Sequence, residues 1–276
     1  MTGLRPTYGR VSRHGAMALS WTMDKVGPMC RSVEDCALVF NAIYGPDGKD
    51  DTVVDAPFNW TSSTPVAKLR IGYVASEFVP QAPPQGGGRG AAAGAADSAA
   101  ARQQREARLK VLVDALDVYR TMGATLEPVE LPESITKIAT TISFVLTTEG
   151  AAAFDDLMRS KDSNDPSLNT WPNAFRTHRF VPAVEYIRAQ RARTLLMREM
   201  DAWMRRFDVL LSPTSSATLG VTNLTGHPAL ALKAGFVDNA PVELMVTGRL
   251  YDEATILRAA LAFERATVWH TKNPTL

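Results

Sequence analysis

Small and hydroxyl-bearing residues gather in the stretch SSATLGVTNLTGHPALAL, which covers residues 215–232. Directly before it, the sequence DVLLSP predicts a buried strand that ends at Pro213. Loops behind the carboxyl ends of strands in α/β sheets often carry binding and catalytic groups, because the sheet holds them in place. We interpret this stretch as a candidate site loop, although an ordinary connection punctuated by Gly and Pro fits its composition equally well.

Two further patterns could suggest a nucleophile or a metal, and both are insufficient. Ser134 and Lys137 match S-x-x-K, in which a lysine can activate a serine, but the companion K-T-G is missing, so we interpret the match as fortuitous. The G-x-S-x-G pattern of α/β-hydrolases is absent. No histidine has a second ligand at metal-binding spacing, so we predict no metal and no other cofactor; the histidines are His14, His178, His227 and His270.

A group of arginines lies on a long predicted helix over residues 184–207. A basic stripe of this kind can hold phosphates. Acidic residues interleave with the arginines, however, and this pattern favours a solvated face with i,i+4 ion pairs. The arginines are Arg188, Arg191, Arg193, Arg198, Arg205 and Arg206, and the acidic residues are Glu185, Glu199 and Asp201.

The composition indicates a soluble globular protein. Of the 276 residues, 45% are hydrophobic and 21% are charged, and the net charge is +1, which favours neither nucleic acid nor membrane as a partner. Cys36 falls on a predicted helix and is expected to be a small core residue rather than half of a disulfide with Cys30. No secretory signal and no run of about 18 apolar residues is visible, so we expect a cytoplasmic location.

The elements that must position a site follow an α/β order. Ser32 begins a capping box, and Gly45 should end the helix that follows it. Strands at 69–74 and 125–131 flank a predicted helix at 102–122, which suggests a βαβ unit. The alternation predicts an α/β fold whose central sheet is covered on both faces; its other predicted elements are helices at 135–160 and 252–269, strands at 229–233 and 242–247, and a loop at 163–175.

Residues 81–101, QAPPQGGGRGAAAGAADSAAA, are of low complexity. Gly-rich loops can bind phosphates, but no Lys-Ser or Lys-Thr pair follows these glycines. The run also lacks the apolar residues that would offset the entropy of ordering it. We predict a disordered surface insertion.

Long motifs at both ends of the chain resemble the amidase signature family. The segments GLRPTYGRVSRHG and SWTMDKVGPM, followed by a V-x-D helix, occur here in the family's order just downstream of its catalytic serines. The tail of the chain resembles the family's closing helices, strands and loop. The segments that carry this resemblance are AQRARTLLMREMDAWMRRFDVLLSPT, TNLTGHPALAL and PVELMVTGRLYDEATILRAALAFERAT. The resemblance covers nearly all of the chain outside residues 81–101, and implies an α/β/α sandwich around a mixed β-sheet.

The resemblance also implies hydrolysis of a carboxamide through an acyl-serine intermediate. A lysine, a bridging serine and a nucleophilic serine perform this chemistry in the family, because a serine hydroxyl needs a base to take its proton. The segments that carry these three groups lie upstream of the GLRPT run, so we assign no catalytic residue to this chain. We therefore expect residues 1–276 to be the C-terminal part of a single amidase domain and to be inactive alone. The missing N-terminal half could reflect a fragment, a misplaced start or a genuine short protein.

The resemblance leaves substrate contacts to this chain. Trp21 and Met23 lie close behind the missing serines, and Asn223 and Thr225 belong to a run that resembles the family loop near the acyl site. These four residues are the predicted substrate-binding set. Asp24 is expected to be a structural hydrogen-bond acceptor.

Three functions remain open at this point. The first is a general amidase that acts on a small-molecule amide. For this function we expect no nucleic-acid or membrane partner, and a homo-oligomer is compatible with the sequence. The second is the A subunit of a glutamine-dependent aminoacyl-tRNA amidotransferase, which the absence of a carboxylate in residues 215–217 disfavours. The third is a non-catalytic pseudoenzyme or binding module.

Overall fold

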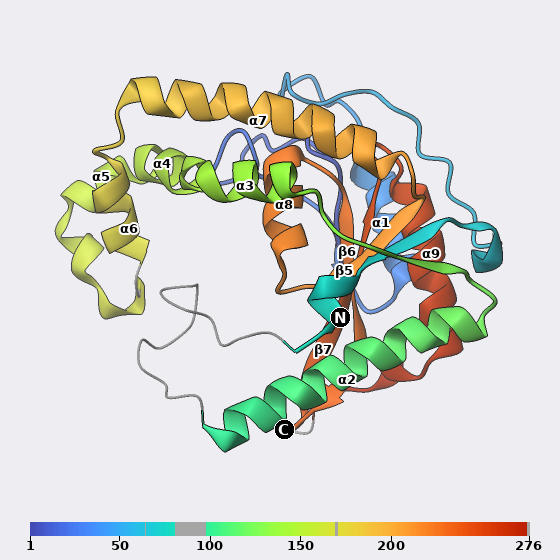
Figure 1. Ribbon diagram of the computed structural model, residues 1–276. Helices are drawn as coiled ribbons and strands as arrows, with labels where there is room; N and C mark the ends of the chain where they lie inside the picture. Colours follow the sequence, from blue (N-terminus) through green and yellow to red (C-terminus); the bar gives the residue numbers. More distant parts are fainter. Residues whose placement is uncertain (64, 81–97, 169–170, 275–276) are drawn as a thin grey trace.

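The computed structural model describes residues 1–63, 65–80, 98–168 and 171–274. Within these ranges the strands form one mixed sheet of seven, in the order β2-β1-β6-β7-β5-β3-β4 (Figure 1). β3, β4 and β5 are parallel to one another, and the remaining pairs are antiparallel. The strands are β1 (Thr2–Arg5), β2 (Met29–Cys30), β3 (Ile71–Val74), β4 (Leu126–Val129), β5 (Val209–Pro213), β6 (Ala229–Val237) and β7 (Ala240–Gly248).

Helices cover both faces of this sheet, which confirms the predicted α/β/α sandwich (Figure 1). One core lies between the sheet and α1, α2 and α9, and the other lies between the sheet and α3, α4, α7 and α8. The helices are α1 (Val33–Ile43), α2 (Ala99–Thr121), α3 (Glu133–Thr141), α4 (Phe144–Ala153), α5 (Asp155–Arg159), α6 (Trp171–His178), α7 (Ala183–Met204), α8 (Ala217–Thr225) and α9 (Glu253–Ala266).

Local signals account for several of these elements. Ser32 and Asp35 form the predicted capping box at the start of α1, and Cys36 packs in the core as a free thiol. The predicted βαβ unit is confirmed, because β3 and β4 pair in parallel on either side of α2. The side chain of Asp252 accepts a hydrogen bond from Thr255 N and begins α9.

Three predicted segments differ from the structure. The single helix at 135–160 is divided into α3, α4 and α5. Near the first break, the hydroxyls of Thr140 and Thr141 donate to carbonyls four residues earlier, a pattern that bends helices. The predicted loop at 163–175 contains the first residues of α6, where aromatic packing of Trp171 on Phe175 overrides the turn-rich composition. Residues 81–97 of the predicted insertion lie outside the described residues, whereas residues 99–101 form the first turn of α2.

Gly27 brings the chain against β1 at a distance that only glycine allows. A Cβ at this position would lie 2.1 Å from the backbone oxygen of Leu4 and 2.6 Å from Pro6 Cδ. Next to it, Leu4 N donates to Pro28 O at 2.9 Å. Residues 24–28 are therefore held directly beside the first strand.

We expect Gly27→Ala to lower the free energy of unfolding by about 1–3 kcal/mol or more, because the clash is with backbone and cannot be relieved by a rotamer. Urea denaturation measures the change. Gly220→Ala is the matched control: a Cβ there meets nothing within 4 Å, and helix propensity predicts stabilisation by about 0.5–1 kcal/mol. Equal effects of the two substitutions would contradict the proposed close approach.

Candidate functional site

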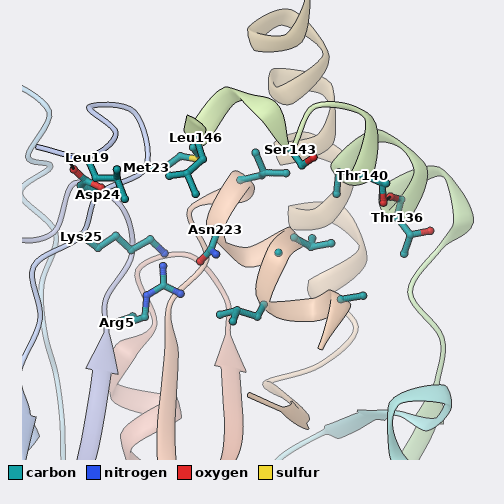
Figure 2. Close-up of a pocket in the computed structure, with 16 residues that line it drawn as sticks. Arg5, Leu19, Met23, Asp24, Lys25, Thr136, Thr140, Ser143, Leu146 and Asn223 are labelled. Atoms are coloured by element: carbon teal, nitrogen blue, oxygen red, sulfur yellow. Dashed lines mark hydrogen bonds between the residues drawn. The ribbon is translucent and has the colours of Figure 1, made fainter. Parts of the chain in front are cut away.

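A cavity of about 710 Å³ opens between residues 19–25, β1 and the helices α3, α4 and α8 (Figure 2). Its walls are mainly apolar, and a few polar groups converge on it, which is the usual character of a small-molecule site. The lining residues are Arg5, Leu19, Met23, Asp24, Lys25, Thr136, Ala139, Thr140, Ser143, Leu146, Ala217, Leu219, Gly220, Val221, Asn223 and Leu224.

Hydrogen bonds to its own backbone fold residues 19–25 into a compact turn. Asp24 Oδ2 accepts from Leu19 N at 2.7 Å and from Ser20 N at 2.9 Å. The backbone N–H of Met23 and that of Asp24 both donate to Ser20 O. Asp24 is thus a structural acceptor, as predicted, and it fixes the wall on which Met23 lies.

Glu149 on α4 ties this turn to α7. It is only 3% exposed, and its carboxylate accepts from Ser20 Oγ at 2.6 Å, Thr22 Oγ1 at 2.6 Å and Thr22 N at 3.1 Å. From α7, Tyr186 OH donates at 2.8 Å and Gln190 Nε2 at 3.0 Å. Burial would raise the pKa of Glu149, but these hydrogen bonds outweigh burial and hold it below its ordinary value.

Arg193 completes the link between the turn and α8. Its guanidinium donates to Leu224 O at 2.6 Å and to Thr22 O at 2.7 Å, and it is only 5% exposed. The sequence placed Arg193 on a solvated face, and this is wrong because the arginine satisfies the carbonyl at the end of α8. Two other arginines of this helix form the predicted exposed ion pairs on α7: Arg188 pairs with Glu185, and Arg205 pairs with Asp201.

Two basic side chains reach the floor of the pocket beside Asn223 (Figure 2). Lys25 is half-buried, and its Nζ donates to His227 O at 2.6 Å. Burial lowers the pKa of Lys25 well below its ordinary value, and the charge of Arg5 lowers it further. Burial also lowers the pKa of Arg5. Asn223 Oδ1 is buried without a hydrogen bond within the described part of the chain.

His227 lies below this floor and is completely buried. Its Nδ1 is 2.9 Å from Thr225 Oγ1, whose own proton is donated to Val221 O. Burial, and then the positive charge of Lys25, lower the pKa of His227 to about 4. The imidazole is therefore neutral at physiological pH.

This depressed pKa predicts a pH-dependent stability. The folded protein resists protonation of His227, so its contribution is fully present above pH 6.5 and is lost as the pH falls towards 4. The loss should reach roughly 3 kcal/mol, at about 1.4 kcal/mol per pKa unit. Urea denaturation from pH 7 to pH 4 should show a shallower decline in His227→Gln than in the parent protein; identical slopes would contradict the assignment.

The structure separates the four predicted substrate contacts. Met23 and Asn223 line the 710 Å³ cavity. Trp21 is 51% exposed and lines a neighbouring cavity of about 480 Å³, which shares Leu19, Asp24 and Lys25 with the first. Thr225 is fully buried beside His227.

Half of the predicted site loop at 215–232 is helical, and residues 229–232 belong to β6. Residues 217–225 form α8, which ends at Gly226 in a left-handed conformation with φ +80°. At its start, Thr218 N and Oγ1 both donate to Glu77 at 3.0 Å, so a carboxylate 141 positions away caps the helix. Ser216 occupies the N-cap position without a side-chain capping hydrogen bond, so the cap that forms comes from Glu77, whereas Gly226 is a stop that the sequence signals.

Ser134 and Lys137, the residues of the S-x-x-K match, do not line the cavity and have other partners. Ser134 Oγ donates to Glu199, and Lys137 pairs with Glu133 at 2.6 Å on the exposed face of α3. Over the described ranges, no group of three or more His, Cys, Asp or Glu side chains could hold a metal ion. Likewise, no described helix is long and apolar enough to cross a membrane.

Sequence reasoning missed Arg5 and Lys25 as pocket residues. Arg5 follows Leu4, which is 2% exposed in the core, and alternation along a strand turns Arg5 to the opposite face. This signal becomes readable only once residues 2–5 are known to be a strand. Lys25 is brought to the pocket by the turn at Asp24 and by the approach at Gly27.

Comparison with known proteins gives consistent matches. The amidase family model matches residues 1–220. The glutamyl-tRNA(Gln) amidotransferase subunits A of Roseiflexus sp. (strain RS-1) and Chloroflexus aggregans are 30% and 32% identical to this chain over its whole length. The chain spans 61% of the length of each of these relatives.

Solved structures share the fold. An amidase family protein from Bacillus anthracis str. Ames superposes with a TM-score of 0.74 at 21% identity, over 100% of this chain and 55% of that one. A peptide amidase in complex with the competitive inhibitor chymostatin gives 0.73 at 22% identity, over 100% and 60%.

Proposed function

Because this chain belongs to the amidase family, we propose that it forms the substrate pocket of an enzyme that hydrolyses the C–N bond of a carboxamide. The observation that carries the proposal is the 710 Å³ cavity, in which a turn from the N-terminal motifs and a helix from the C-terminal motifs meet. Its apolar walls and few polar groups suit a small amide. In this proposal the reaction passes through an acyl-serine intermediate.

The proposed roles of this chain's residues are binding and positioning. Met23 and Leu224 would contact the apolar part of the substrate, and the Asn223 side-chain amide would hydrogen-bond to a polar group. Trp21, at the adjoining cavity, would contact longer substrates. Thr225 would act through His227, since its side chain is buried.

We propose no residue of this chain for the lysine–serine–serine machinery. The lysine and the serine beside the cavity that could be considered for these roles have other hydrogen-bond partners. Lys25 Nζ donates to the carbonyl of His227, and Ser20 Oγ donates to Glu149. A serine whose proton is held by a buried carboxylate, away from the lysine, is not arranged as a nucleophile with its base. We accordingly expect residues 1–276 to release no ammonia from amides by themselves.

Ammonia release tests this function. A panel of aliphatic and aromatic carboxamides would be incubated with the 276-residue chain and with the product of the gene's whole reading frame, including any in-frame codons upstream. Release by the longer product alone supports the proposal. Turnover by the 276-residue chain overturns the expectation of inactivity, and no release from either overturns the hydrolase function.

A second function is favoured by the relatives' names, since curated proteins similar to this chain include glutamyl-tRNA(Gln) amidotransferase subunits A. This chain would then deliver ammonia from glutamine within a complex of subunits. Residues 215–217 offer no carboxylate for the amino group of glutamine, and the nearby Glu77 is engaged in capping α8. Glutamine-dependent release that requires a co-purifying subunit would support this function over the first.

A further inference from the structure

The floor of the cavity brings two basic groups, Arg5 and Lys25, together without an acidic partner among the described residues. In Figure 2 the Arg5 guanidinium points up from β1 towards the Lys25 side chain and Asn223. The charge of Arg5 is close enough to disfavour the protonated form of Lys25. Like charges placed side by side at a partly buried site are unfavourable unless an anion joins them.

The neighbouring acids do not fill this role. Asp24, the carboxylate on the cavity wall, accepts two backbone N–H groups of its own turn. Across the described ranges, the Arg5 guanidinium has no ion pair or side-chain hydrogen bond, and the only acceptor recorded for Lys25 Nζ is the neutral carbonyl of His227. Glu253, which favours the protonated form of Lys25, is itself paired with Arg10.

We infer that Arg5, Lys25 and Asn223 bind the carboxylate of a substrate that carries its amide at the other end. A guanidinium and a carboxylate match in shape and can form two parallel hydrogen bonds, and an ammonium adds a third donor. Nδ2 of Asn223 carries two N–H donors, and Oδ1 makes no hydrogen bond within the described residues, so turning the amide to aim Nδ2 at the carboxylate breaks no hydrogen bond of that oxygen. A bound anion would also relieve the repulsion between the two basic groups.

This inference rests on the proposed amide hydrolysis and narrows its substrate class. Apolar side chains such as Met23, Leu146 and Leu224 line the walls above the charged floor. A short aliphatic chain fits this lining, so the expected substrates are ω-amides of dicarboxylic acids, for which succinamate is the simplest probe. Neutral amides of the same size should bind more weakly, because they leave the two basic groups unpaired.

Calorimetry on the whole 276-residue chain tests binding without requiring turnover. Succinamate and succinate are the anionic probes, and succinamide is the neutral probe of matched shape. We expect the anions to bind about 10- to 100-fold more tightly than succinamide, in the range of a hydrogen bond to a charged group. Arg5→Gln and Lys25→Met should each remove at least tenfold of that preference.

Matched controls carry the same chemical changes on the surface. Arg188→Gln and Lys110→Met remove charges whose side chains are 73% and 74% exposed, and they should leave anion binding unchanged. If a pocket variant fails to fold by near-UV circular dichroism, the comparison of probes on the parent protein still decides. Equal binding of succinamide and succinamate, or no binding of either, overturns the inference.

The two proposals fail differently. Succinamate binding without ammonia release from the product of the whole reading frame would overturn the hydrolase function alone. Ammonia release from neutral amides at the same rate as from succinamate, unchanged by Arg5→Gln, would overturn the carboxylate site alone.

Discussion

Glu253→Gln is expected to lower the free energy of unfolding by about 3–5 kcal/mol, the usual cost of removing one partner of a buried ion pair. The side chains of Glu253 and Arg10 are both 0% exposed, with Arg10 Nε 3.3 Å from Glu253 Oε2. Glu253 Oε1 also accepts from Thr7 N at 2.8 Å. The substitution keeps the shape of the side chain but leaves the Arg10 charge buried without a counter-charge.

Urea denaturation of an exposed-pair control and of a double-mutant cycle, with Arg10→Met and Glu253→Leu measured singly and together, separates this effect from general disruption. Glu133→Gln removes one partner of an exposed pair, in which both side chains are at least 73% exposed, and should change stability by less than about 1 kcal/mol. Arg10→Met combined with Glu253→Leu should lose less than the sum of the single variants, because no charge is stranded. Additive losses would show that the pair is not coupled.

Glu149→Ala is expected to cost about 3–5 kcal/mol, because it leaves several buried donors from two elements unpaired at once. The carboxylate holds the turn at Ser20 and Thr22 against Tyr186 and Gln190 of α7. The same variant should weaken succinamate binding, since Met23 and Lys25 belong to that turn. Glu185→Ala is the control, because Glu185 lies on α7 with 52% exposure.

The lowered pKa of Glu149 sets the sign of its pH dependence. The ionised form is favoured in the folded protein, so its contribution is fully present above the ordinary value near 4.5. It is lost as the pH falls through the lower folded pKa. Denaturation between pH 6 and pH 3 should therefore show a steeper acid loss in the parent protein than in Glu149→Ala, and parallel curves would contradict this.

Elements with local signals were predicted correctly. The capping box at Ser32 begins α1, and the apolar period and turn residues around α2 gave the βαβ unit with β3 and β4. Strands β5, β6 and β7 were visible as apolar runs, although β6 and β7 are longer than predicted. In each case the information lies within a few residues of the element.

Elements and contacts that depend on distant partners could not be read. β1 is a strand because it pairs with β6, and α8 begins where it does because Glu77 accepts from Thr218. Arg193 is buried because the end of α8 offers it a carbonyl. The cavity floor combines both problems, since Arg5 and Lys25 are functional candidates only through the sheet and the turn that bring them together.

The place of β1 in the sheet also has a consequence for how the protein is made. Gly3, Leu4 and Arg5 pair with Ala231, Leu230 and Ala229, so this edge of β1 must wait for a segment more than two hundred residues later. Pairings of such high contact order are slow to form and leave edges exposed in the meantime. During translation β2 can pair with one edge of β1 early, whereas the edge that receives β6 stays open until residues 229–231 have been synthesised, and a chaperone is expected to shield that edge.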